Sequence, residues 1–290
     1  MKSLRSLFGY LIAVLTLISC EKPIVPDASP SGHTGNVTLR FHPTSEDTTR
    51  SSLAQYFSKL NVQLFDADWN KVFDKVKTQT SADEDFGILS FQLAAGTYTV
   101  VAVGHSSTIS ATIKSPEVVQ FTASNGEKLT DTFCACQQIV VSGSHADYTL
   151  DMYRVCAMIQ FCLEDESVPN NFAYFKMEYT GGSANFNPTT SEGITKSNQS
   201  ETRIRNDMMI HQAYTFPYMS ASCLLKITCT ATDSDGTIIR QRTFTDVPVT
   251  RNRITTYHGP FFGEGDGQFI QSDFSFVIHA DWEGEDKYTF

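Results

Sequence analysis

The chain has 290 residues and an acidic balance, with 22 lysines and arginines against 32 aspartates and glutamates. Its formal net charge of −10, with no basic cluster in the sequence, excludes nucleic acid and anionic lipid surfaces as electrostatic partners. This length suggests one large or two medium domains, either of which can bury a sizeable core.

The first twenty residues have the pattern of a bacterial lipoprotein signal. A basic start with Lys2 and Arg5 is followed by an apolar run over 7–17, and then by a small residue and Cys20. The run is shorter than the about 20 residues that a spanning helix needs, so we expect residues 1–19 to be removed as a signal peptide. Cys20 would then be the lipidation site, held in the membrane by acyl chains such as palmitate. An ordinary secretory signal with a coincidental cysteine is the alternative.

Residues 20–35 are predicted to form a flexible tether. They include three prolines among serine, aspartate and glycine, without any aromatic residue, which is typical of a linker. Loss of the signal peptide also removes two positive charges and moves the formal net charge from −10 to −12. A half-buried strand follows the tether, because Val37, Leu39 and Phe41 alternate with polar residues.

A short amphipathic helix is predicted after this strand. Leu53, Tyr56, Phe57 and Leu60 have the i, i+3, i+4, i+7 spacing of one helix face, and Ser51-Ser52 precedes them as a cap. Beyond the helix, alternation returns between turn-forming clusters and predicts strands at 61–65, 88–93, 98–103, 118–121 and 138–141.

A turn-forming break at 142–145 separates the two halves of the sequence. An alternating segment over 148–152 follows it, and the apolar parity then shifts by one residue for the run over 155–163. Such a shift sends the apolar side chains to the opposite face. Either a bulge lies near Tyr153-Arg154, or the strand serves two surfaces.

The second half has the same kind of pattern. Alternation over 225–231 leads through Asp233-Ser234-Asp235-Gly236 into 238–244, which predicts a β-hairpin. Runs at 253–258 and 274–280 supply the last strands.

Many short strands with a single helix predict an all-β fold class. The break near His145 divides it into two β-sandwich domains in series, an N-terminal one over 36–148 and a C-terminal one over 149–290.

Six cysteines remain after Cys20, an even number that suggests disulfides in an exported protein. Cys156 and Cys162 lie six residues apart in a predicted strand, as do Cys223 and Cys229, so each pair spans roughly 20 Å. A disulfide needs Cα atoms within about 7 Å, so neither pair can close on itself. Cross-pairing of Cys156 with Cys229 and Cys162 with Cys223 would match an antiparallel register, but buried free thiols are the favoured interpretation.

Five short motifs follow one another along the chain. Each is weak evidence for a family by itself, but their order makes the set more specific. They are Phe65-Asp66-Ala67-Asp68, the stretch from Ala95 to Val103, Thr130-Asp131-Thr132-Phe133, Tyr179-Thr180-Gly181-Gly182-Ser183 and Arg251-Asn252-Arg253-Ile254-Thr255-Thr256. Together with the lipidation signal, they resemble the fimbrillin-associated anchor subunits (FimB-like) of Bacteroidales type V fimbriae over almost the whole mature chain.

The resemblance implies two transthyretin-like β-sandwiches on an outer-membrane lipoprotein that holds a fimbrial stalk at the cell surface. The implied partner is a fimbrillin stalk subunit, and the implied contact is strand complementation, in which one subunit's strand completes a neighbour's sheet. Phe274, Phe276, Ile278 and Ala280 alternate along the last strand and are the candidate subunit-binding residues. The alternative is that this segment is simply the last strand of the C-terminal sandwich.

Two further expectations concern the N-terminal region. Stalk precursors of the resembling system are cut after an arginine near the first strand, and Arg50 is the candidate position in this chain. Anchors are implied to stay uncut, so we expect the strand over 37–41 to stay in its own sheet; an ordinary solvated arginine is the alternative. Glu21 is followed at once by Lys22, whereas surface lipoproteins of these bacteria often carry an acidic run, so surface or periplasmic orientation stays open.

The sequence predicts no enzyme. It has no convincing Ser-His-Asp set, helical metal pair or phosphate-binding glycine loop, so no catalytic residue, metal ligand or cofactor is assigned. Cys134-Ala135-Cys136 lacks the second ligand pair of a zinc site, and the acidic loop at 263–267 lacks regular calcium-ligand spacing. The alternative function is a surface glycan-binding lipoprotein or fimbrial tip adhesin, whose aromatic platform would use Trp69 or Trp282 together with tyrosine and phenylalanine.

Overall fold

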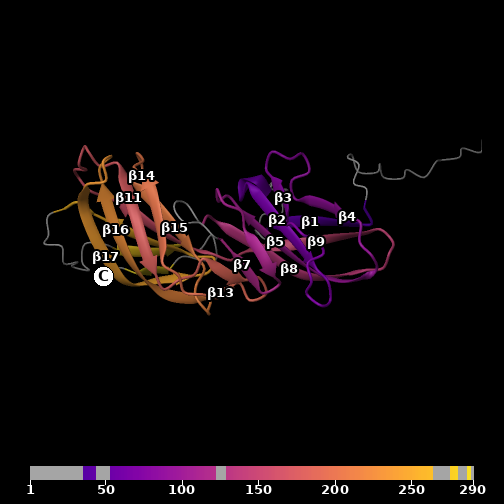
Figure 1. Cartoon of the computed structure of the whole chain (residues 1–290). Helices are drawn as coiled ribbons and strands as arrows, with labels where there is room; N and C mark the ends of the chain where they lie inside the picture. The colour runs from indigo at the N-terminus through magenta and orange to yellow at the C-terminus, as the bar shows by residue number, and fades with distance from the viewer. Residues whose placement is uncertain (1–34, 44–52, 122–128, 264–274, 280–285, 289–290) are drawn as a thin grey trace, which may run out of the picture. The chain divides into compact units, whose positions relative to one another are not determined.

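The computed structural model describes residues 35–43, 53–121, 129–263, 275–279 and 286–288 (Figure 1). They form the all-β fold that the alternation predicted, with one 3-10 helix in this part of the chain, η1 (Leu53–Gln55). The strands up to the middle of the chain are β1 (Val37–Pro43), β2 (Lys59–Phe65), β3 (Lys77–Thr80), β4 (Ile88–Phe91), β5 (Gly96–His105), β6 (Thr112–Ser115), β7 (Val118–Gln120), β8 (Thr132–Val141), β9 (Ala146–Arg154) and β10 (Ala157–Leu163). The later strands are β11 (Tyr174–Thr180), β12 (Asn185–Asn187), β13 (Glu192–Gly193), β14 (Gln199–Ile204), β15 (Ile210–Thr215), β16 (Ser222–Thr232), β17 (Ile238–Thr250), β18 (Ile254–Gly259), β19 (Ser275–His279) and β20 (Asp286–Tyr288).

These strands form four sheets. The seven-stranded sheet has the order β3-β2-β5-β8-β9-β1-β4 and uses strands from the first half of the chain. The five-stranded sheet, β15-β10-β18-β19-β20, and the four-stranded β14-β11-β16-β17 sheet use strands from the second half. The remaining sheet, β13-β12-β7-β6, combines strands from both halves, and we call it the junction sheet.

The first strand is integrated into the interior of the seven-stranded sheet. β1 pairs with β9 in parallel, from Val37 opposite Ala146 to Pro43 opposite Met152. On its other side it pairs with β4 in the antiparallel sense. Its alternating residues Val37, Leu39 and Phe41 are buried, as the sequence predicted.

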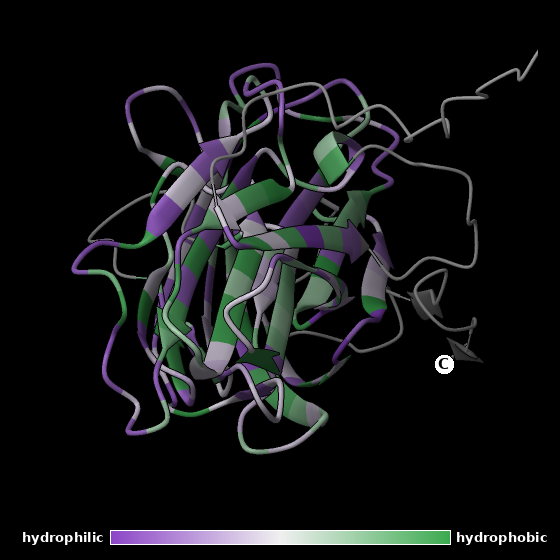
Figure 2. Ribbon diagram, turned by 90° about the vertical axis from the view of Figure 1, so that its right-hand side faces the viewer, coloured by the Kyte–Doolittle hydropathy of each residue, from purple (hydrophilic) through white to green (hydrophobic). Residues whose placement is uncertain are grey.

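Three clusters of buried side chains form the core. The first lies within the seven-stranded sheet and includes Leu39 and Val100. The second lies between the five-stranded sheet and the β14-β11-β16-β17 sheet, and includes Phe161 and Met177. The third joins strands of both halves of the chain around Phe216. Figure 2 shows the alternation behind these cores as hydrophobic and hydrophilic bands along the strands, with many hydrophilic loops around them.

The parity shift near Tyr153-Arg154 marks a change of sheet. β9 ends at Arg154 in the seven-stranded sheet, and β10 begins at Ala157 in the five-stranded sheet. Met152 belongs to the first core cluster, Val155 to the third and Ala157 to the second. Of the two explanations left open by the sequence, the one in which the segment serves two surfaces is therefore correct.

The predicted helix over 53–60 is wrong. The chain makes only the single turn of η1, and Leu60 already lies in β2. Leu53, Phe57 and Leu60 are nevertheless buried in the first core cluster. A helical spacing of apolar residues can therefore also arise from a 3-10 turn followed by a strand, because this arrangement buries the same side chains as a two-turn helix would.

The predicted hairpin at 233–236 is confirmed. β16 and β17 pair in the antiparallel sense on either side of it. Asp233 Oδ1 accepts hydrogen bonds from the backbone N–H groups of Asp235 and Thr237, at 3.0 and 2.8 Å. Gly236 has a φ of 83°, which a residue without Cβ adopts at little cost.

The predicted domain boundary between residues 148 and 149 falls inside β9, a strand of the seven-stranded sheet. The division into two sandwich domains at that position stays a prediction.

Candidate functional site

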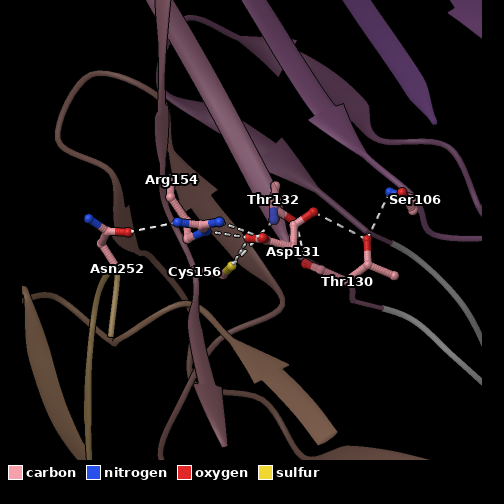
Figure 3. Close-up of polar contacts among 7 residues, drawn as sticks. All are labelled: Ser106, Thr130, Asp131, Thr132, Arg154, Cys156 and Asn252. Atoms are coloured by element: carbon pink, nitrogen blue, oxygen red, sulfur yellow. Dashed lines mark hydrogen bonds and ion pairs between the residues drawn. The ribbon is translucent and has the colours of Figure 1, made fainter. Parts of the chain in front are cut away.

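The side chain of Arg154 ties the end of β9 to the start of β8 (Figure 3). Its Nε lies 2.7 Å from Asp131 Oδ1 and its Nη2 lies 2.8 Å from Oδ2, a bidentate ion pair. The Arg154 and Asp131 side chains are 14% and 24% exposed, and the guanidinium also lies over the ring of Phe133. These two parallel charge-assisted hydrogen bonds are partly shielded from water, and they fix the orientation and distance of the guanidinium relative to the carboxylate.

The same guanidinium reaches the second half of the chain. Arg154 Nη1 donates to Asn252 Oδ1 at 3.2 Å, and Asn252 lies in the turn between β17 and β18. The backbone N–H of Asn252 donates to the carbonyl of Cys156 at 2.8 Å. Asn252 has a φ of 57°, a left-handed conformation that asparagine tolerates better than most residues. It therefore holds the β9–β10 connection at two points.

The Cys156 thiol completes this network. Its Sγ lies 3.6 Å from Asp131 Oδ1 and accepts a hydrogen bond from the backbone N–H of Thr132 at 3.3 Å. Burial, and then the nearby Asp131 carboxylate, raise the pKa of the thiol well above its ordinary value. The thiol therefore stays protonated and can donate to the carboxylate. We call Asp131, Arg154, Cys156 and Asn252 the junction network.

The junction sheet adds backbone hydrogen bonds between the two halves. β7 pairs with β12, where Val119 lies opposite Phe186, and the Phe121 N–H donates to the Ala184 carbonyl at 3.2 Å. The Phe186 ring packs against Phe216, with 4.6 Å between ring centroids. Main-chain pairing and aromatic packing thus join the halves beside the junction network.

The Gly181-Gly182-Ser183 motif has a steric role near this junction. Gly181 has a φ of 106°, and a Cβ on it would lie 2.4 Å from the Leu224 carbonyl oxygen. A Cβ on Gly182 would lie 2.0 Å from Thr215 Oγ1. Ser183 exchanges two backbone hydrogen bonds with Phe216, each 3.0 Å long. Both glycines therefore allow the chain to pass close to its neighbours before β12.

The structure brings together two motifs that the sequence presented separately. Asp131 comes from Thr130-Asp131-Thr132-Phe133, and Asn252 comes from Arg251-Asn252-Arg253-Ile254-Thr255-Thr256. Sequence analysis did not identify Arg154 as their link, although it placed the parity shift at this residue. A single arginine within an otherwise apolar stretch marks the position in the sequence, but nothing in the sequence indicates its partners.

The candidate residues predicted from the sequence lie only partly within the described structure. Cys20, Arg50, Phe274 and Ala280 lie outside the described residues. Phe276 and Ile278 lie in β19, where their backbones pair with Tyr257 and Thr255 of β18. The same β19 residues pair on the other side with Tyr288 and Asp286 of β20. β19 therefore extends the five-stranded sheet, and β20 follows it at the edge.

The six cysteines after Cys20 are free thiols, which agrees with the favoured interpretation. The cross-pairing alternative is wrong, because Cys156, Cys162, Cys223 and Cys229 are all free. β10, which contains Cys162, pairs with β15 and β18, whereas β16, which contains Cys223, pairs with β11 and β17. Cys162 and Cys223 therefore do not lie on adjacent strands.

The structure describes only some of the residues that the sequence suggested for metal binding or for an aromatic platform. Among the described residues, no group of three or more His, Cys, Asp or Glu side chains is placed to hold a metal ion. The acidic loop at 263–267 lies outside them from residue 264 onward. Trp69 is exposed in the turn between β2 and β3, and Trp282 is outside the described residues. No helix in the described ranges has the length and apolar character needed to cross a membrane.

Comparison with known proteins identifies relatives of this fold. The family of fimbrillin-A associated anchor proteins Mfa1 and Mfa2 matches residues 25–287. No curated protein matches the chain.

Three solved structures resemble the fold at low sequence identity. A candidate adhesin from Bacteroides thetaiotaomicron is 14% identical, with a TM-score of 0.53 over 87% of this chain and 97% of that chain. A protein from the same organism, described as a candidate polysaccharide-binding protein, is 10% identical, with a TM-score of 0.52 over 87% and 98% of the two chains. The fimbrial anchor protein Mfa2 from Porphyromonas gingivalis is 13% identical, with a TM-score of 0.45 over 87% and 97%.

Proposed function

Because the chain belongs to the family of fimbrillin-A associated anchor proteins, we propose that it is a lipoprotein that anchors a fimbrial stalk in the outer membrane. Membership of this family gives it a fimbria-associated role at the cell surface, in a family of structural proteins and not of enzymes. The match over residues 25–287 is the observation that carries the proposal.

The membrane end of the proposed anchor is Cys20. A basic start, a short apolar run and a small residue before this cysteine support lipidation there. Two acyl chains or more would make the attachment stable. Metabolic labelling with a palmitate analogue tests this step: the wild-type protein takes up label and stays with the outer membrane. Cys20→Ala is expected to lose the label and leave the membrane fraction, and a variant that stays membrane-bound without label would contradict the proposal.

The stalk end of the proposed anchor is β19. Five residue pairs join β19 to β18, whereas three join it to the short β20 at the edge of the sheet. Displacement of β20 would uncover the backbone N–H and C=O groups of β19, which a fimbrillin strand could satisfy. Phe276 and Ile278, two of the alternating residues Phe274, Phe276, Ile278 and Ala280, would then contact the incoming subunit.

A binding experiment with mature protein tests the stalk end. The partner is a purified fimbrillin stalk subunit, and the readout is the dissociation constant. Phe276→Asp combined with Ile278→Asp is expected to abolish binding, because charge is unfavourable in alternate apolar pockets. Leu224→Asp is the matched control, since Leu224 is exposed on a different sheet and should bind normally. Wild-type affinity in the double variant would refute the assignment of β19.

The position of β1 supports an anchor that keeps its first strand. β1 lies between β9 and β4, so its place in the seven-stranded sheet is filled by the chain itself. We expect Arg50 to remain uncut, and mass spectrometry of the protein from cells should find residues 36–60 joined to the rest. A mature N-terminus at residue 51 would show instead that this chain is processed as a stalk precursor is.

A further inference from the structure

The pairing of β1 with β9 has a direction that matters if the protein is pulled. We propose that β1 and β9 form a mechanical clamp, in which tension entering from the N-terminal side loads their hydrogen bonds in shear. The N-terminal segment joins the fold at β1, and the chain leaves β9 for the second half at Arg154. Tension between these two points passes through the β1–β9 pair.

The parallel arrangement determines how that tension acts. In the register, Val37 lies opposite Ala146 and Pro43 lies opposite Met152. The start of β1 and the end of β9 are therefore at opposite ends of the ladder. Pulling on them slides one strand along the other, so the hydrogen bonds share the load and must fail together. Pulling on the start of β1 and the start of β9 would open the same ladder one bond at a time.

Side-chain contacts reinforce the point where tension enters. The Asn36 amide exchanges two hydrogen bonds with the Leu93 backbone, donating to its carbonyl at 2.8 Å and accepting from its N–H at 2.9 Å. The Asn36 carbonyl also accepts from the Ala146 N–H at 2.9 Å. The chain is thus held on both sides before β1 begins. The buried side chains of Val37 and Leu39 oppose sliding as well, because it would pull them out of their packing.

The junction network reinforces the point where tension leaves. Arg154, the last residue of β9, is bound to Asp131 and to Asn252. Asp131 lies beside β8 of the seven-stranded sheet, and Asn252 lies beside β18 of the five-stranded sheet. Load at Arg154 is therefore shared by two sheets. The clamp is therefore connected to the second half by more than its covalent chain.

The clamp would act in cells only if the proposed anchoring through Cys20 holds, so its biological role rests on the proposed function. The mechanical claim itself needs neither lipid nor fimbrillin. It is tested by single-molecule pulling on the mature chain with one handle at residue 20, in place of the lipid. The second handle is placed at exposed Tyr153 for the shear geometry, or at exposed Ser144 for the opening geometry.

Both handle-bearing proteins break the same ladder, so each is a control for the other. The handles should be attached through non-natural amino acids, because the chain has six free thiols after Cys20. Equal thermal unfolding midpoints would show that the handles leave the fold unchanged. At one loading rate we expect the unfolding force to be several-fold higher with the handle at Tyr153 than with the handle at Ser144. Equal forces, or a higher force at Ser144, would overturn the clamp and leave the anchor proposal intact.

Discussion

The first and last strands that the structure describes are held in contrasting ways. β1 lies inside a sheet, with seven residue pairs to β9, four to β4 and its apolar side chains buried. β20 lies at the edge of another sheet, with three residue pairs to β19. The anchor proposed above would need to keep its membrane end folded and to present an accessible sheet edge to a partner. The two ends of one all-β chain therefore differ in how firmly their sheets hold them: β1 is paired on both sides, and β20 is paired on one.

The largest expected effect comes from weakening the packing of β1. Leu39→Ala removes a fully buried side chain and leaves a cavity, so we expect it to lower the free energy of unfolding by about 2–5 kcal/mol. Urea unfolding followed by circular dichroism measures this change. Val140→Ala, at an exposed site, is the control and should change stability by less than about 0.5 kcal/mol. A similar small effect for Leu39→Ala would show that β1 is not held as described.

A second, smaller effect is expected at the junction network. Arg154→Ala leaves the Asp131 carboxylate without its bidentate partner, and we expect a loss of about 2 kcal/mol. Arg40→Ala is the matched control, because the Arg40–Asp147 pair is exposed and should contribute less than about 1 kcal/mol. Calorimetry adds a second readout: separate transitions in Arg154→Ala, where the wild type has one, would indicate that the network couples the halves. Equal losses in both variants would argue against a special role for Arg154.

Acid should weaken both halves of the molecule. Burial lowers the pKa of His105 in β5 and of His211 in β15 to about 4 in each case. Both histidines have lower pKa values folded than unfolded, so their contribution to stability is complete above about pH 6.5 and is lost as pH falls toward 4. His105 Nδ1 accepts from the Ser107 N–H, which a protonated ring could not do.

His211→Phe separates the two contributions. Within the described residues neither ring nitrogen of His211 has a hydrogen-bond partner, and its ring stacks on Phe175. Phenylalanine keeps the stacking and cannot be protonated. When the pH falls from 7 to 4.5, the free energy of unfolding should decrease in both proteins. We expect this decrease to be about 2 kcal/mol smaller in the variant than in the wild type. Urea unfolding at both pH values measures this difference, and parallel losses in the two proteins would contradict the prediction.

The smallest stability effect is expected at the C-terminal edge. Deletion of residues 286–290 removes β20, and we expect it to lower the free energy of unfolding by less than about 1 kcal/mol, because three edge pairs are lost. The same deletion should strengthen fimbrillin binding if β20 covers the proposed contact strand. A stability loss as large as that of Leu39→Ala would remove the contrast between the two ends.

The fold class followed from the sequence because most strands have one buried and one solvated face. β1 and the β16–β17 hairpin were predicted for this reason, although β17 continues to Thr250, beyond the predicted 238–244. β2 and β5 were also predicted, but both are buried on two faces over much of their length. β14 was missed because Gln199 and Glu201 are buried polar residues there, so the apolar period is hidden. β11 does alternate, at Phe175, Met177 and Tyr179, and its pattern was available but not used.

The junction network could not have been predicted from local patterns. Asp131, Arg154 and Asn252 are far apart in the sequence, and each is an ordinary polar residue in its own segment. Their meeting depends on β9 changing into β10 at the parity shift, and on the turn after β17 returning to that point. Such a contact depends on strand order, which local patterns in a single sequence do not reveal.

The junction sheet has a consequence for anyone who would divide the molecule. A fragment that ends after β9 would contain β7 without its partner β12. The unpaired backbone groups of β7 could then pair with a strand of another molecule. Fragments expressed alone would therefore tend to aggregate, and recombination that shuffles one half against a foreign one would fail unless the shared sheet were matched. The two halves should therefore be expressed and exchanged together.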